Sequence, residues 1–155
     1  MPGGTNFKVI ALDPGGTTGY AWAEINDGKV TEFGGGQGQL TEGNLHAMLS
    51  AICPSAIVAE SFEFRQRQRD GLVLVSRNLL GVSRLWAELR DVPHTEQSAA
   101  QGKAFFTDQK LRAVGAYTRG SPHKNDATRH LLYWLTFSKG ARLLEKPYYK
   151  GQIKE

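Results

Sequence analysis

A short apolar run that stops at an aspartate is the feature that most constrains the fold of this chain. Residues 9–12 read Val-Ile-Ala-Leu, and Asp13-Pro14-Gly15-Gly16 follows directly. Because proline and glycine interrupt regular structure, this pattern predicts a buried strand that ends in a turn. A second branched apolar run, residues 56–59, ends at Glu60. We therefore expect two buried strands that each end in a carboxylate.

The segments around these strands predict a hairpin and a helix. Residues 20–25 and 30–33 flank the turn Asn26-Asp27-Gly28, which is typical of a tight hairpin. The glycine-rich residues 34–38 predict a flexible loop. Thr41 and Asn44 are candidate caps for a helix that Pro54 ends.

The second half of the chain predicts alternating strands and helices. Apolar residues at steps of three and four predict a long amphipathic helix from Leu72 to Leu89. Residues 92–95 predict a strand, residues 107–116 a helix, and Asn125 or Asp126 opens a last helix that reaches Phe137. This order predicts a mixed sheet with helices on its faces. We expect one domain, residues 1–138, and a basic tail, residues 139–155.

Composition limits the class of protein. The chain has 155 residues, of which 40% are hydrophobic, and this suits one globular domain. No apolar stretch approaches the roughly 20 residues of a membrane span, and the N-terminus lacks the features of a signal peptide. The single Cys53 excludes an internal disulfide framework and a cysteine-built zinc site. We expect a soluble, cytoplasmic protein.

Charge is distributed unevenly along the chain. Residues 1–100 hold 8 Lys and Arg against 11 Asp and Glu, whereas residues 101–155 hold 11 against 4. A basic C-terminal third beside an acidic remainder suits a protein that binds a polyanion and keeps its carboxylates for another role.

Four polar residues are candidates for chemistry because of where the predicted elements place them. Asp13 and Glu60 end strands, and Asp126 lies at the start of the last helix, three residues after His123. Strand ends at one edge of a sheet converge, and such oxygen-rich sites bind hard cations. The set therefore suits two Mg²⁺ ions about 4 Å apart, an arrangement that cuts phosphodiesters. Taken singly, Asp13 is also a typical turn former and Asp126 a typical helix cap.

Four segments occur in an order that is typical of one family. They are residues 9–21 (VIALDPGGTTGYA), 57–62 (IVAESF), 93–96 (PHTE, followed by Ala99 and Lys103) and 123–127 (HKNDA). In these segments the chain resembles the RuvC-type Holliday junction resolvases, in particular the small, bacteriophage-encoded kind. The resemblance implies a ribonuclease H-like fold: a mixed five-stranded sheet with an antiparallel meander and helices on both faces.

The same resemblance implies an activity and a site. It implies a magnesium-dependent endonuclease that cuts branched DNA by two-metal hydrolysis, with Mn²⁺ as a possible substitute. The metal ligands would be Asp13, Glu60, His123 and Asp126. Many relatives have aspartate at the position of His123, where a neutral imidazole can bind a metal or move a proton but brings less negative charge. The resemblance also implies a homodimer, for which the helix from Leu72 to Leu89 supplies spare apolar surface.

Basic and aromatic residues supply candidates for DNA contacts. A loop just past Glu60 combines two aromatic rings with three arginines, a combination that suits phosphates and unstacked bases. Its residues are Phe62, Phe64, Arg65, Arg67 and Arg69. Further candidates for phosphate contacts are Lys103, Lys110, Arg112, Arg119 and Lys124.

Several alternatives remain open on the sequence. Glu63, three residues further on, competes with Glu60 for the role of the acid that follows the strand at residues 56–59. His130 is predicted to be a half-buried helix residue rather than part of the site. A nuclease that processes RNA, similar to ribonuclease H or to YqgF-type proteins, would need the same metals. Residues 13–19 also resemble the phosphate loop of sugar kinases and actin-like ATPases, which need two such domains. A catalytically silent DNA-binding module is the last alternative.

Overall fold

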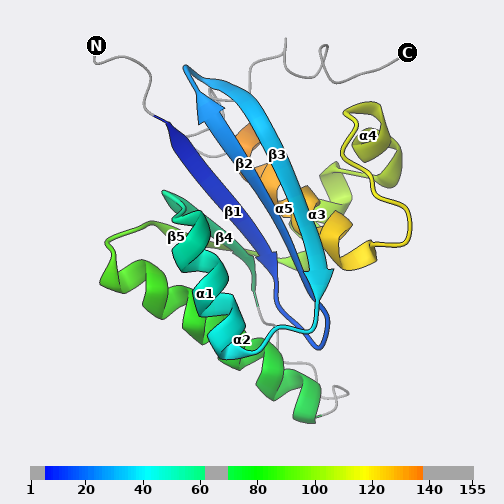
Figure 1. The fold of residues 1–155 in the computed structure, drawn as a ribbon. Coiled ribbons are helices and arrows are strands. Elements are labelled where there is room, and N and C mark those ends of the chain that lie inside the picture. Colours follow the sequence, from blue (N-terminus) through cyan, green and yellow to red (C-terminus); the bar gives the residue numbers. More distant parts are fainter. Residues whose placement is uncertain (1–5, 62–69, 138–155) are drawn as a thin grey trace.

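A five-stranded mixed sheet forms the centre of the protein (Figure 1). The structure, a computed structural model, describes residues 6–61 and 70–137, and for residues 70–73 the backbone alone. The strands are β1 (Phe7–Asp13), β2 (Thr18–Asn26), β3 (Lys29–Gly38), β4 (Ala56–Glu60) and β5 (His94–Gln97), in the order β3-β2-β1-β4-β5. The first three form an antiparallel meander, and β4 and β5 run parallel to β1.

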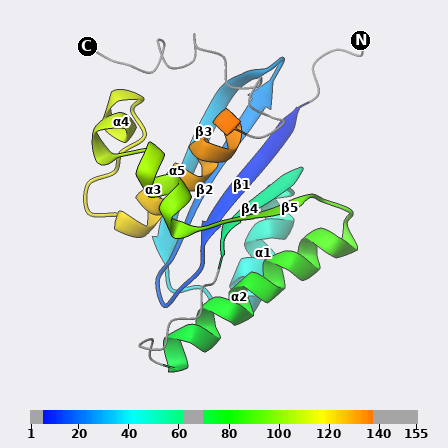
Figure 2. The ribbon, with the colours of Figure 1, turned by 180° about the vertical axis from the view of Figure 1, so that it is seen from behind.

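Helices cover both faces of the sheet (Figures 1 and 2). One face carries α1 (Glu42–Ile52) and α2 (Asp70–Leu89), and the other carries α3 (Ala99–Phe105), α4 (Asp108–Ala113) and α5 (Pro122–Phe137). Side chains alternate along β1, so that Val9 and Ala11 pack toward α5 while Ile10 and Leu12 pack toward α1 and α2. The predicted ribonuclease H-like architecture is confirmed. In the part of the chain that is described, no helix is long and apolar enough to cross a membrane.

The prediction of a flexible loop at residues 34–38 was wrong. These residues continue β3 and pair with β2 as far as Gly38 and Thr18. A Cβ at Gly34 would lie 2.9 Å from the Trp22 ring, and one at Gly36 would lie 2.6 Å from the Tyr20 hydroxyl. The glycines therefore make room for the aromatic side chains of β2 to lie across β3.

The predicted start of the last helix was also wrong. The helix α5 begins at Pro122, where the fixed φ of proline suits the first helical position. Asn125 does not cap it. Instead its side chain accepts from the backbone N–H of Thr118 and donates to the carbonyl of Thr118, both at 2.9 Å. His123 and Asp126 therefore share one face of the first turns.

Smaller differences concern the segment before α5. The sequence did not predict α3, although Ser98 and Gln101 form a capping box at its start. The strand expected at residues 92–95 lies at His94–Gln97, and the helix expected to reach residue 116 ends at Ala113. The predicted helices before Pro54 and up to Leu89 are present. The predicted tail, residues 139–155, lies outside the described residues.

Candidate metal centre

Asp13 and Glu60 come together at one edge of the sheet. Each ends its strand, and the parallel register pairs Leu12 with Ala59 just before them. Their carboxyl groups are hydrogen-bonded to each other. Both side chains are largely covered, with 15% of Asp13 and 18% of Glu60 exposed. The expected convergence of these two acids is thus observed.

The two carboxyl groups hold one proton between them in the absence of a cation. Burial, the hydrogen bond with Glu60 and the charges of Glu60 and Asp126 raise the pKa of Asp13 to about 9. Burial alone would raise the pKa of Glu60 too, but hydrogen bonds from His130 and Asp13 outweigh it and lower that pKa to about 2. Two such carboxylates cannot both ionise at short range without a compensating positive charge.

This proton makes the stability of the metal-free protein depend on pH. Between pH 3.8 and about 9 the folded protein keeps a proton on Asp13 that the unfolded chain releases, so stability falls as pH rises. Glu60 acts oppositely, but only between about 2 and 4.5. We expect urea unfolding in EDTA to give a free energy of unfolding lower by about 1–3 kcal/mol at about pH 8 than at about pH 5.

The matched variant for this prediction is Asp13→Asn, which cannot ionise. The free energy of unfolding of this variant should no longer fall between about pH 5 and about pH 8. An unchanged pH dependence in Asp13→Asn would contradict the shared-proton account.

The helix α5 places three further polar side chains near the pair. His123 Nδ1 lies 3.7 Å from Asp13 Oδ2, and His130 Nε2 lies 3.5 Å from Glu60 Oε2. Asp126 is close enough for its charge to raise the pKa of Asp13. The start of α5 is fixed by Gln37 of β3, whose Oε1 accepts from the backbone N–H groups of His123 and Lys124 at 3.0 and 3.3 Å.

Asp126 forms ion pairs with two basic side chains. Arg129 Nη1 donates to Asp126 Oδ1 at 2.7 Å, and Lys103 Nζ lies 3.6 Å from Asp126 Oδ2. Arg129 is itself buried and also donates to the Phe106 carbonyl and to Asp108. Among the described residues, no three His, Cys, Asp or Glu side chains are grouped to hold a metal ion. The crowded, proton-sharing pair nevertheless has the donor chemistry that a hard divalent cation needs.

Arg129 should be a major contributor to stability. We expect Arg129→Leu to lower the free energy of unfolding by about 2–4 kcal/mol, because Asp126 and the Phe106 carbonyl lose a buried donor. The control is Arg84→Leu, which removes a two-bond ion pair with Glu96 whose arginine side chain is 54% exposed. It should cost about 0.2–1 kcal/mol. Equal losses in urea unfolding would contradict the prediction.

Sequence reasoning missed three neighbours of the site. His130 is 1% exposed and touches Glu60, so the expectation of a half-buried histidine away from the site was wrong. Lys103 was assigned to DNA contacts alone, and Arg129 was not singled out. The spacing of Arg129 three residues after Asp126 was the available signal, since such pairs meet on a helix. Glu63 lies outside the described residues.

The predicted DNA-contact residues are only partly described. Phe62, Phe64, Arg65, Arg67 and Arg69 lie outside the described residues. On the α3–α5 side, Lys110 lies over the Phe105 ring and Arg112 over the Tyr117 ring, at 4.1 and 4.2 Å from the ring centroids. Arg119 is exposed in the turn before α5.

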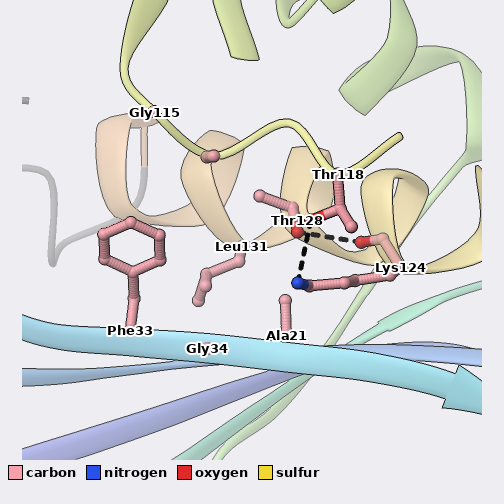
Figure 3. A pocket seen from close by; sticks show the side chains of 9 residues that line it. Ala21, Phe33, Gly34, Gly115, Thr118, Lys124, Thr128 and Leu131 are labelled. Carbon is pink, nitrogen blue, oxygen red and sulfur yellow. Dashed lines mark hydrogen bonds between the residues drawn. The ribbon is translucent and has the colours of Figure 1, made fainter. Parts of the chain in front are cut away.

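Lys124 lines a small cavity of about 120 Å³ between the sheet and α5 (Figure 3). Its Nζ donates to Thr118 Oγ1 at 2.9 Å, and its carbonyl accepts from Thr128 Oγ1 at 2.8 Å. Ala21, Phe33 and Leu131 supply apolar walls from β2, β3 and α5. The cavity thus presents one ammonium group within largely apolar surroundings.

Comparison with solved structures identifies proteins with the same fold. RuvC of T. thermophilus in complex with a Holliday junction substrate superposes with a TM-score of 0.64 at 18% identity, over 87% of this chain and 98% of that chain. A second T. thermophilus RuvC structure gives 0.55 at 17% identity, over 86% and 96%. The yeast mitochondrial Holliday junction resolvase gives 0.51 at 12% identity, over 98% and 82%. No protein-family model and no curated protein sequence matches the chain. The chain therefore shares the RuvC-like fold.

Proposed function

We propose that this chain is a divalent-metal-dependent endonuclease that cuts branched DNA, as a Holliday junction resolvase does. The observation that carries the proposal is the Asp13–Glu60 pair, whose hydrogen-bonded carboxyl groups lie at the end of adjacent parallel strands. A bound cation would relieve the repulsion between the two carboxylates. The RuvC-like fold supports the choice of branched DNA as substrate.

The four predicted ligands have different roles in this proposal. Asp13 and Glu60 hold the cations, and Asp126 completes the oxygen donors from α5. These carboxylates would hold Mg²⁺ or Mn²⁺, and the bound metal would supply activation of the attacking water and charge stabilisation at the leaving oxygen. His123 has 43% of its side chain exposed beside Asp13, so it is accessible to a substrate and suited to accept or return a proton.

Basic residues on the α3–α5 side would hold the DNA backbone. Lys110, Arg112, Arg119 and Lys124 all come from the segment between α3 and the start of α5. Each phosphate contact releases counterions, so binding should weaken steeply with salt. The arginines and phenylalanines of residues 62–69 and the basic residues 139–155 remain candidates for further contacts. We assign the nuclease domain to residues 1–138.

A second copy of the chain is the proposed partner of α2. Leu74, Leu85 and Leu89 are 56%, 55% and 71% exposed. Their spacing puts them along one side of the helix, with Gly81 open between them. A two-fold dimer through this stripe would present two sites to the two symmetric strands of a junction.

The dimer is tested by Leu85→Glu. We expect wild type to sediment as a dimer at micromolar concentration and Leu85→Glu as a monomer, because burying the new charge is costly. His46→Glu on the exposed surface of α1 is the control and should stay dimeric. A monomeric wild type, or a Leu85→Glu variant that stays dimeric, would contradict the proposed interface.

A substrate panel tests the proposed activity. Labelled four-way junction, linear DNA duplex and RNA–DNA hybrid are incubated with the protein in Mg²⁺, in Mn²⁺ and in EDTA. We expect metal-dependent cutting of the junction with little cutting of the duplex. Cutting of the hybrid but not of the junction would assign the chain to RNA processing. No cutting of any substrate in either metal would overturn the proposal.

A further inference from the structure

One buried histidine beside the carboxylate pair is held at both ends of its ring. His130 Nδ1 lies 2.8 Å from Gln97 Oε1, and His130 Nε2 lies 3.5 Å from Glu60 Oε2. His130 is 1% exposed and Gln97 is 4% exposed. The imidazole therefore has a polar partner near each ring nitrogen, whereas an apolar side chain at this position would contribute to packing alone.

The sheet register places both partners of the ring side by side. Glu60 pairs with Gln97 in the parallel ladder of β4 and β5, and residues paired in this way project from the same face of a sheet. The backbone N–H of Ser61 also donates to the Gln97 carbonyl at 2.7 Å. The helix α5 then brings His130 over this pair of strand ends.

The helix α3 also packs closely against the His130 ring. A Cβ at the buried Gly102 would lie 3.2 Å from His130 Nδ1 and 3.3 Å from the Arg129 Cβ. The glycine thus lets α3 lie directly against the ring. Elements β4, β5, α3 and α5 together fix one orientation of this imidazole.

We propose that His130, oriented by Gln97, is a positioning residue that holds the Glu60 carboxylate in the orientation that binds the metal. The inference rests on the proposed function and adds a residue outside the four predicted site residues. Hydrogen-bonded partners of metal-binding carboxylates and imidazoles restrict their motion, and their loss weakens metal binding about 10–100-fold. Gln97 acts one step further out, because its Oε1 contacts the ring of His130.

Mn²⁺ binding to the full-length chain, measured by titration calorimetry without DNA, tests the inference. We expect His130→Ala to raise the Mn²⁺ dissociation constant about 10–100-fold. His130→Gln, which keeps a donor, should recover part of the loss, and Gln97→Leu should weaken binding less than His130→Ala. His46→Ala, which removes an exposed histidine on α1, should bind Mn²⁺ as wild type does.

A double-mutant cycle separates positioning from general loosening. In a Glu60→Gln background, His130→Ala should change the remaining Mn²⁺ affinity by less than about twofold. Urea unfolding in EDTA identifies variants that fold, and if His130→Ala does not fold, then His130→Gln and Gln97→Leu carry the test. Folded His130 and Gln97 variants with wild-type Mn²⁺ affinity would overturn the inference. An equal effect of His130→Ala with and without Glu60 would overturn it as well.

The outcomes also distinguish this inference from the proposed function. A chain that binds Mn²⁺ through Asp13 but responds to no change at His130 contradicts the positioning role alone. A chain that shows the His130 effect on Mn²⁺ but cuts no DNA contradicts the nuclease activity alone. A wild-type chain that binds no Mn²⁺ contradicts both.

Discussion

Asp13→Asn should abolish cutting while leaving the protein folded and able to bind DNA. The carboxylate lies at the centre of the site, within reach of Glu60, His123 and the charge of Asp126. We expect the rate of junction cleavage in Mg²⁺ to fall at least about 1000-fold, equivalent to about 4 kcal/mol of transition-state stabilisation. Single-turnover cleavage and gel-shift binding of a labelled junction measure the two effects separately.

The matched control is Asp27→Asn. Asp27 is exposed in the turn between β2 and β3, beyond the opposite end of β1 from Asp13. Its φ of 53° is one that asparagine also adopts, so cleavage and stability should stay as in wild type. Cleavage by Asp13→Asn at a wild-type rate would remove Asp13 from the mechanism. Parallel loss of cleavage in Asp27→Asn would show that the assay reports fold damage.

Gly19→Ala should lower both the stability of the fold and the rate of cleavage, although Gly19 is not one of the predicted site residues. A Cβ at Gly19 would lie 1.9 Å from the His123 carbonyl oxygen and 2.9 Å from the Lys124 nitrogen. Backbone atoms cannot rotate aside, so the start of α5 must move. We expect the free energy of unfolding to fall by about 2–3 kcal/mol and cleavage to fall about 100-fold, since His123 and Asp126 move with the helix.

Gly38→Ala is the control for this substitution. Gly38 lies on the neighbouring strand, one residue beyond the partner of Gly19, and a Cβ there would meet nothing within 4 Å. Its stability and cleavage should match wild type within about 0.5 kcal/mol and twofold. Urea unfolding and single-turnover cleavage provide the comparison. Equal behaviour of the two alanine variants would show that α5 does not need the close approach at Gly19.

The strand-end acids were predictable because each is local to its own strand. An apolar run that ends at an acid places the carboxylate at a sheet edge, whatever the rest of the chain does, and Asp13 and Glu60 met as expected. The mixed five-stranded sheet with its antiparallel meander and the helices on both faces also followed from local patterns and from the family resemblance. Features that depend on a single segment of the chain could therefore be predicted from the sequence.

The remaining parts of the site depend on pairs of distant segments. His130 reaches Glu60 only because of the way α5 crosses the ends of β4 and β5, and periodicity does not fix that crossing. Gln37 fixes the start of α5 from the part of β3, residues 34–38, that was predicted to be a loop. Composition made residues 34–38 look flexible, whereas Gly34 and Gly36 leave room for the side chains of Trp22 and Tyr20. Tertiary packing decided these features.

Addition of Mg²⁺ to a preformed complex tests the central claim most directly. The protein is bound to a labelled four-way junction in EDTA, excess MgCl₂ is added, and the products are resolved over time beside a linear duplex of the same sequence. The account predicts that cutting begins only after Mg²⁺ is added, that it produces nicks in two opposing strands of the junction, and that the duplex stays intact. An uncut junction in excess Mg²⁺, or equal cutting of junction and duplex, would contradict a junction-selective metal centre at Asp13 and Glu60.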